Sequence, residues 1–320
     1  MKKVLIIGSG AMGAAFSVPL IDNKHKVTLT EPYNIKLLKK LLNKKKFHPN
    51  LKIAMSKKLS IKKLTPQIIS QKWDLIVVAV SSIGIELIRK YLKNFNQKTS
   101  ILILTKGLKY DKKIKRIITM PEQLSTGNKK LNISVLKGPC LAKELARKIK
   151  SYTVVANKNI RVAKKIGKLI STNYYKTEYS TDVRGIEFSS AIKNIYSMII
   201  GSGEGNNTSS ALFRKSFDEM EYLIKFFKGK KETIQGLAGI GDLYVSAVGG
   251  RNSKMGEYLG KGFTFKNAKK KFMKNETVEG ADLAYEIAPY IFRKINKKKI
   301  PLMISLLTAI CRNKKLKLIN

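Results

Sequence analysis

The chain has 320 residues and carries 64 Lys and Arg against 21 Asp and Glu, so its formal net charge is +43. Apolar residues make up 43% of the sequence, which is too many for a disordered chain and enough for two packed domains. The longest apolar runs, such as 75–80, are far shorter than a helix that crosses a bilayer, so we expect no membrane span.

The excess positive charge could indicate nucleic-acid binding through counterion release. Most of the positive residues are Lys, however, and they are scattered singly and in short runs such as 44–46 and 269–271. No RNA-recognition or zinc-finger motif accompanies them. This pattern favours compositional drift, and we expect no specific nucleic-acid partner.

The residues that commonly bind metals or form disulfides are few. Cys140 and Cys311 make no disulfide framework, and His25 and His48 have no ligand-like spacing. We therefore expect no metal site. We also expect a cytoplasmic location, because a protein with only two cysteines suits a reducing compartment.

The N-terminus predicts a dinucleotide-binding turn. Residues 4–7 form a short apolar run that is typical of a strand buried on both faces. Gly8, Gly10 and Gly13 follow in a G-x-G-x-x-G pattern, and a helix is expected to begin there. The three glycines would permit the tight turn, the approach of a pyrophosphate to the backbone, and close packing of the helix on the strand.

Glu31 closes the next apolar strand. An acid at this place is positioned to bond the ribose hydroxyls of an adenine dinucleotide. Because a carboxylate would repel a 2′-phosphate, the sequence predicts NAD as the preferred cofactor, with NADP as the alternative.

Further strands are expected before residue 183, and together they predict a doubly wound, mostly parallel sheet of the Rossmann type. The expected strands cover residues 75–80, 100–105, 131–137, 151–157 and 173–180, the last two separated by a helix over 160–171. Lys106 follows one of these strands, at the sheet edge where ligands of open α/β sheets bind.

After about residue 181 the pattern changes to helices. The helix expected over 184–201 is broadly apolar, but Glu187, Ser190, Lys193, Asn194 and Ser197 recur at steps of three and four and share one face. A polar stripe on an otherwise buried helix must meet partners or a ligand, because burying a charge alone is costly. Further helices are expected over 208–227, 277–295 and 300–313.

Seven blocks, in this order, resemble the soluble NAD(P)-dependent glycerol-3-phosphate dehydrogenases: "GSGAMGAA", "LTKGL", "GPCLAKELA", "SSAIKNIYS", "GLAGIGDL", "GGRN" and "VEG". The resemblance implies a Rossmann domain over 1–183 and an all-α substrate domain over 184–320. It also implies reversible hydride transfer between sn-glycerol 3-phosphate and dihydroxyacetone phosphate, which supplies glycerophospholipid precursors. A homodimer is a further expectation.

The same resemblance implies roles for individual residues. The catalytic residues would be Lys193, as proton acceptor from the substrate hydroxyl, together with Lys106 and Asp242. The substrate-binding residues would be Lys106, Gly138, Cys140, Lys193, Asn194, Asp242, Ser246, Gly250, Arg251 and Asn252. The cofactor-binding residues would be Gly8, Gly10, Ala11, Met12, Gly13, Glu31, Lys106, Ala142, Arg251, Thr277 and Glu279.

The lone acid in the glycine-rich stretch 236–252 then has a physical role. The resemblance places two ammonium groups, Lys106 and Lys193, at a dianionic substrate, where they repel each other. Asp242 would hold the pair in place and adjust how readily Lys193 accepts a proton. Arg251 would offer a fork-shaped donor to the phosphate oxygens.

Two alternatives stay open at the level of sequence. One is a related β-hydroxyacid or 6-phosphogluconate-type dehydrogenase, which shares the glycine turn and a lysine in a helical domain. The other is a basic nucleic-acid-binding protein that retains the fold without catalysis. The block that runs from Asp242 to Asn252 favours the glycerol phosphate enzymes over the first alternative, and the intact set of lysine, aspartate and arginine favours them over the second.

Overall fold

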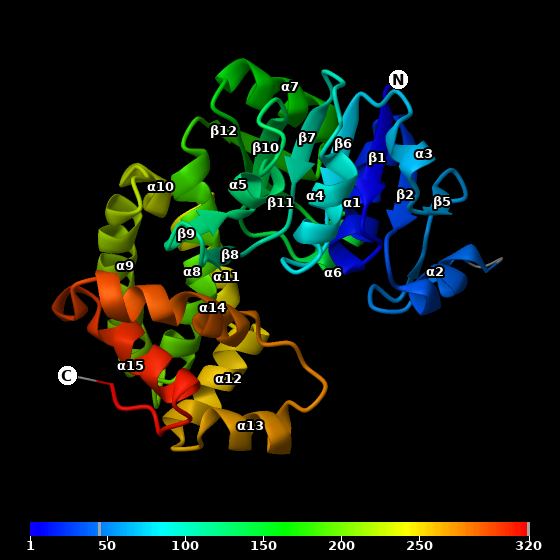
Figure 1. Cartoon of the computed structure of the whole chain (residues 1–320). Helices are drawn as coiled ribbons and strands as arrows, with labels where there is room; N and C mark the ends of the chain where they lie inside the picture. Colours follow the sequence, from blue (N-terminus) through cyan, green and yellow to red (C-terminus); the bar gives the residue numbers. More distant parts are fainter. Residues whose placement is uncertain (44–45, 319–320) are drawn as a thin grey trace. The chain divides into compact units, whose positions relative to one another are not determined.

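The computed structural model describes residues 1–43 and 46–318. The chain forms two compact units: the first contains Met1–Lys106 and Met120–Val183, and the second contains Gly107–Thr119 and the chain from Arg184 onward (Figure 1). Each unit has its own core of buried apolar side chains.

An eight-stranded sheet forms the centre of the first unit, and seven helices accompany it among the described residues. From one edge to the other its strands are β12 (Tyr175–Ser180), β11 (Ser151–Ala156), β10 (Asn132–Lys137), β7 (Ser100–Ile103), β6 (Leu75–Val78), β1 (Lys3–Ile7), β2 (Lys26–Glu31) and β5 (Ser60–Lys63). The helices are α1 (Ala11–Asp22), α2 (Ile35–Leu42), α3 (Pro66–Ile69), α4 (Ile85–Leu92), α5 (Met120–Leu124), α6 (Ala142–Ala146) and α7 (Ile160–Ile170). A small hairpin of β3 (Phe47–His48) and β4 (Ile53–Ala54) lies outside the sheet.

The strand order confirms the predicted doubly wound topology. Every neighbouring pair in the sheet is parallel except β10 and β11, which are antiparallel. β6 is buried along its whole length, as its continuous apolar run predicts for a strand covered by helices on both faces. α1 contacts α6 and α7, whereas α4 contacts α5, and Figure 1 shows these two groups on opposite faces of the sheet.

Among its described residues, up to 318, the second unit is helical apart from one hairpin. Its helices are α8 (Val183–Gly201), α9 (Asn206–Phe226), α10 (Glu232–Gln235), the π-helix η1 (Leu237–Gly241), α11 (Asp242–Ala247), α12 (Arg251–Gly260), α13 (Phe265–Phe272), α14 (Glu279–Lys294), the 3-10 turn η2 (Lys297–Lys299) and α15 (Pro301–Cys311). The hairpin consists of β8 (Leu108–Asp111) and β9 (Arg116–Thr119), and it packs on α14. Leu108 and Ile117 belong to the core of this unit.

α8 is the central helix of the second unit, and its residues are buried from Gly185 to Ile200. The polar stripe predicted on this helix is therefore buried as well, which confirms that it does not face solvent. A helix that is enclosed on all sides can hold charged side chains in fixed positions only where neighbouring elements supply polar partners.

Glycines let α12 approach α8 closely. A Cβ on Gly256 would lie 1.9 Å from the carbonyl oxygen of Met198, and a Cβ on Gly260 would lie 2.3 Å from that of Ser202. Both obstructing atoms are backbone atoms, which cannot rotate away as a side-chain tip can. The two helices can therefore lie side by side only because α12 carries glycines at these positions.

This packing makes a stability prediction. Gly256→Ala should lower the free energy of unfolding by about 1–3 kcal/mol or more, because the added methyl group would force the helices apart. Gly249→Ala is the matched control, since a Cβ there would meet no atom within 4 Å. Urea denaturation measures both variants, and equal midpoints would contradict this account of the contact.

Candidate active site

Lys193 and Asp242 form a buried ion pair in the second unit. The Nζ atom of Lys193 lies 2.9 Å from Oδ1 of Asp242, and the two side chains are 8% and 4% exposed. Lys193 also donates a hydrogen bond to the Ser246 hydroxyl. Asp242 and Ser246 are four residues apart on α11 and therefore share one face of that helix. Asp242 and Ser246, both predicted from the sequence, thus lie around the ammonium group of the predicted Lys193.

A second contact, one helical turn away, aligns the two segments that carry this pair. The Ser189 hydroxyl donates to the carbonyl oxygen of Ala238 at 3.0 Å. Ser189 precedes Lys193 by one turn of α8, and Ala238 precedes Asp242 by one turn of the η1–α11 segment. A Cβ on Gly239 would lie 2.0 Å from the Ile234 carbonyl oxygen, so this close turn requires glycine there. The glycines around Asp242 therefore allow the backbone path that brings the carboxylate to Lys193.

Asn252 joins three helices of the same unit. Its Nδ2 atom donates to Oδ1 of Asn194 at 3.1 Å, and its Oδ1 atom accepts from the backbone nitrogen of Gly280 at 2.9 Å. Asn194 follows Lys193 on α8, Asn252 lies in the first turn of α12, and Gly280 lies in the first turn of α14. Asn252 was predicted to bind substrate; here its side-chain amide links the beginnings of α12 and α14 to the lysine-bearing helix.

Arg251 and Glu279 form an exposed ion pair beside this network. The Nη2 atom of Arg251 lies 3.2 Å from Oε1 of Glu279, and both side chains are 51% exposed. Nδ2 of Asn194 lies 3.5 Å from the other oxygen of Glu279. Gly250 is the N-cap residue of α12, and Thr277 lies exposed just before α14. These predicted residues therefore lie at two adjacent helix beginnings, where the first N–H groups and the helix dipole favour anions.

In the first unit, the glycine turn has the geometry that its motif predicts. Gly8 has φ +109°, a left-handed conformation that side chains rarely adopt, and a Cβ there would lie 2.6 Å from the Ala79 carbonyl oxygen. A Cβ on Gly13 would lie 1.9 Å from the carbonyl oxygen of Gly8, so the helix can pack against the turn only with glycine at this position. Gly10 has open space around it and caps α1 without a side-chain hydrogen bond. Ala11 and Met12 form the start of α1.

Glu31 is buried at the end of β2 and organises the loops around it. One carboxylate oxygen accepts from the backbone nitrogen of Ser9 at 3.1 Å and from its hydroxyl at 2.5 Å. The other accepts from the backbone nitrogens of Tyr33 at 3.1 Å and Asn34 at 2.8 Å. A carboxylate oxygen has two lone pairs, so a ribose hydroxyl would have to displace one of these donors. The geometry thus shows Glu31 as the acceptor that joins the glycine turn to the loop after β2.

His48, for which the sequence predicted no role, also contacts the glycine turn. It is fully buried, with Nε2 3.0 Å from the Ser9 carbonyl oxygen, while Nδ1 accepts from the Leu51 backbone nitrogen. Burial lowers the pKa of His48, in agreement with a neutral ring that donates from Nε2. The contact joins residues 39 positions apart, and a single histidine without a motif gives no sequence signal for it.

The remaining predicted residues of the first unit lie at the carboxyl ends of β7 and β10. Lys106 is half-buried shortly after β7. Gly138 has φ +119° directly after β10, Cys140 is half-buried, and Ala142 opens α6. Lys137, the last residue of β10, is only 1% exposed and was not selected from the sequence. This is the sheet edge at which ligands of open α/β sheets bind.

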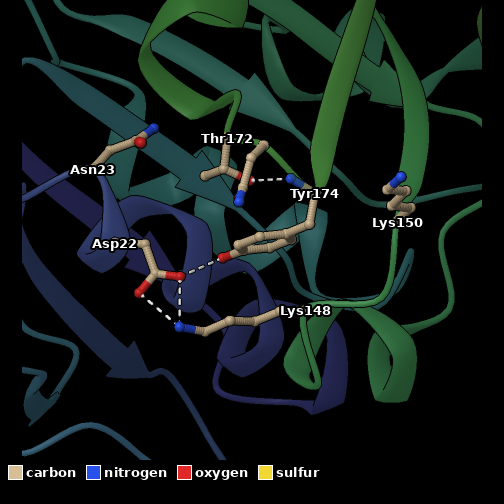
Figure 2. A pocket seen from close by; sticks show the side chains of 7 residues that line it. Asp22, Asn23, Lys148, Lys150, Thr172 and Tyr174 are labelled. Carbon is tan, nitrogen blue, oxygen red and sulfur yellow. Dashed lines mark hydrogen bonds and ion pairs between the residues drawn. The ribbon is translucent and has the colours of Figure 1, made fainter.

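A surface hollow of about 680 Å³ lies elsewhere on the first unit, at the C-terminal end of α1. Figure 2 shows Asp22 in contact with both Tyr174 and Lys148, and the Tyr174 hydroxyl donates to Asp22 at 2.6 Å. Burial and the neighbouring carboxylate raise the pKa of Tyr174. α1 has 12 residues, so its two ends lie roughly 18 Å apart. The hollow is therefore separate from the glycine turn at the other end of this helix.

Two features are absent from the part of the chain that the structure describes. Within residues 1–43 and 46–318, no helix is both long and apolar enough to cross a membrane. In the same part of the chain, no group of three or more His, Cys, Asp or Glu side chains is arranged to hold a metal ion.

Two family models match this chain. The model of the NAD-dependent glycerol-3-phosphate dehydrogenase N-terminus matches residues 3–163, and the model of the C-terminus of the same enzymes matches residues 182–319. The chain belongs to the NAD-dependent glycerol-3-phosphate dehydrogenase family. Matches in both halves confirm the resemblance seen in the seven sequence blocks, and they favour it over the β-hydroxyacid alternative.

Curated members of the glycerol-3-phosphate dehydrogenase family match most of the chain. The NADP(+)-dependent glycerol-3-phosphate dehydrogenase of Archaeoglobus fulgidus is 29% identical over 311 residues, which covers 90% of each protein. The glycerol-3-phosphate dehydrogenase [NAD(P)+] of Clostridium botulinum (strain Alaska E43) is 30% identical over 302 residues, which covers 90% of this chain and 88% of that protein.

A solved structure agrees with the fold. The crystal structure of glycerol-3-phosphate dehydrogenase from Coxiella burnetii has a TM-score of 0.85 to this chain and covers 98% of it, with 96% of that chain matched. The two sequences are 23% identical, so this likeness supports the fold class: a Rossmann-like domain followed by a helical domain.

Proposed function

We propose that this chain is an NAD(P)-dependent glycerol-3-phosphate dehydrogenase, which transfers a hydride reversibly between sn-glycerol 3-phosphate and dihydroxyacetone phosphate. The observation that carries the proposal is the buried Lys193–Asp242 pair within a chain that matches this family in both halves. In this proposal the first unit binds the dinucleotide and the second unit holds the residues that act on the substrate.

The glycine turn fits a dinucleotide. The open space at Gly10 and the lack of a side-chain cap leave the first N–H groups of α1 available to a pyrophosphate. When bound, the nicotinamide would supply or accept the hydride. The protein's part is to bind and orient it and to move the proton at the substrate oxygen.

Lys193 has the chemistry for that proton. In the oxidising direction its neutral amine would accept the proton from the substrate hydroxyl, and in the reducing direction its ammonium would polarise the ketone and donate the proton. Asp242 and Ser246 both contact its Nζ atom and hold that atom in one place. A fixed amine in an enclosed site contributes more than a mobile one, because it needs no reorganisation during the reaction.

Arg251 is suited to the substrate phosphate. Its pair with Glu279 is half-exposed, and exposed ion pairs contribute only about 0–1 kcal/mol. A dianionic phosphate that accepts a forked pair of hydrogen bonds can therefore replace the carboxylate as its partner. The beginning of α12, with Gly250 as its N-cap, adds free N–H groups beside this side chain. Lys106 completes the proposed set as a contact to substrate and cofactor.

The direct test is NADH consumption with dihydroxyacetone phosphate as substrate. We expect saturable turnover that requires the phosphate group, so dihydroxyacetone itself should be a poor substrate. If the protein instead oxidises β-hydroxyacids with NAD and does not reduce dihydroxyacetone phosphate, the β-hydroxyacid or 6-phosphogluconate-type alternative would be favoured. Nucleic-acid binding with a steep salt dependence and without NADH oxidation would favour the non-enzymatic alternative.

Glu31 leads to a prediction about cofactor choice. A buried carboxylate at the end of β2 disfavours a nearby 2′-phosphate, so kcat/KM with NADH should exceed that with NADPH by about tenfold or more. Glu31→Gln removes the charge and should narrow this ratio. Asp74→Asn, just before the amino end of β6 and therefore at the other end of the strands, is the control that should leave the ratio unchanged. A preference for NADPH in the unmodified chain would contradict the prediction.

Assembly and location are also part of the proposal. We expect a homodimer in a reducing cytoplasm, because the chain carries only two cysteines and its family resemblance implies a soluble metabolic enzyme. Sedimentation velocity measures the first expectation and cell fractionation measures the second.

A further inference from the structure

We propose that Lys137 is a positioning residue for Lys106, and this inference rests on the proposed function. Lys137 ends β10 and is 1% exposed. Its Nζ atom donates to the carbonyl oxygen of Thr105 at 2.5 Å. A lysine that is buried this deeply is rare, because an ammonium loses much of its hydration free energy inside a protein.

The contact acts directly on the peptide that carries Lys106. The carbonyl oxygen of Thr105 and the backbone nitrogen of Lys106 lie in one planar peptide group. When Lys137 holds the oxygen, it also fixes the plane from which the Lys106 backbone continues. A hydrogen bond inside a protein is electrostatically stronger than one in water, so this buried contact restrains the peptide more firmly than an exposed one would.

The sheet register explains why these residues meet. β7 and β10 are parallel neighbours, and the last residue pair of their ladder is Ile103 with Val135. Thr105 and Lys137 each follow this pair by two residues, so both lie at the carboxyl ends of the strands. The Lys137 side chain therefore needs to cross only to the adjacent strand to reach the carbonyl.

A second hydrogen bond holds Thr105 from the side of β6. The Thr105 hydroxyl donates to the carbonyl oxygen of Val80 at 2.7 Å, just after β6. Thr105 is thus tied to β6 by its side chain and to β10 by its backbone oxygen. Beyond Lys106 the chain leaves the first unit at Gly107, which has φ +146°. These two contacts therefore hold the peptide group directly before Lys106.

Two single variants, Lys137→Met and Thr105→Val, test the proposal. Each removes one of the two hydrogen bonds of Thr105 and leaves a side chain of similar size. Each should lower kcat/KM for dihydroxyacetone phosphate by about 10- to 100-fold, since a displacement of about 1 Å in a catalytic group has effects of this size. NADH affinity should change less than kcat. Lys176→Met is the matched control, because Lys176 is an exposed lysine on β12 of the same sheet.

Amine rescue separates positioning from direct contact with the ligand. In a Lys106→Ala variant, added ethylammonium replaces the missing amine. Lys137→Met in that variant should cause almost no further loss of kcat/KM, because the free amine does not depend on the hydrogen bond between Lys137 and Thr105. An undiminished loss in that background would overturn the proposal, since Lys137 would then act on the ligand itself.

Hydrogen exchange gives a readout that does not depend on activity. The peptide covering residues 104–107 should exchange faster in Lys137→Met and Thr105→Val than in Lys176→Met. Unchanged exchange together with unchanged kcat/KM would refute the anchor. If the unmodified chain does not reduce dihydroxyacetone phosphate, the proposed function fails, and the exchange rates still decide whether the anchor exists.

Discussion

Lys193→Met should lower kcat by a factor of about 10² to 10⁴ in both directions of the reaction, which is the usual contribution of a positioned acid or base. Met keeps the unbranched shape of Lys, although it is one atom shorter, and it can neither accept nor donate a proton. NADH binding should stay near that of the unmodified chain, because Lys193 would act on the substrate proton and not on the dinucleotide. Stopped-flow absorbance of NADH measures the turnover, and protein fluorescence measures the binding.

The control for this variant is Lys215→Met, which removes an exposed lysine from α9 of the same unit. It should leave kcat unchanged. Because Lys193→Met also removes the ammonium beside a buried carboxylate, folding is checked by circular dichroism before the rates are compared. A folded Lys193→Met variant that retains kcat within about tenfold of the unmodified chain would remove Lys193 from the mechanism.

The elements that could be predicted from the sequence are those with local signals. The G-x-G-x-x-G turn requires particular backbone conformations, and Gly8 and Gly13 have the geometry that this motif predicts. The polar stripe of α8 repeats at helical spacing, so the shared face of Lys193 and Asn194 follows from periodicity alone. The clustering of Asp242 and Ser246 with Lys193 depended on the family resemblance, since no local pattern relates residues about fifty positions apart.

The features that the sequence did not reveal depend on contacts between distant segments. Lys137 looks like any other lysine in a chain with 64 basic residues, and only the β7–β10 register shows that it is buried. The hairpin β8–β9 packs with the helical unit although it lies between strands of the sheet in the sequence. Its apolar residues, such as Leu108, suit either core equally well, so composition cannot assign it.

Asp242→Asn should be the most destabilising single change in the site. The substitution keeps the shape of the side chain but removes the carboxylate 2.9 Å from Lys193, in a place where both side chains are almost fully buried. Breaking a buried ion pair from one side typically lowers the free energy of unfolding by about 3–5 kcal/mol. The buried ammonium is then disfavoured relative to the neutral amine, so the rise of the oxidation rate with pH should move to lower pH. Urea denaturation and the pH dependence of kcat measure the two effects.

A double variant decides whether the broken ion pair causes the loss of stability in Asp242→Asn. If the loss comes from an ammonium deprived of its carboxylate, then Asp242→Asn combined with Lys193→Met should be more stable than Asp242→Asn alone, because no charge remains at that place. If Asp242 mainly holds the backbone of α11, the second substitution should add to the loss instead. Additive losses of stability would therefore show that the carboxylate acts on its own helix, and the pairing argument for Asp242 would fall.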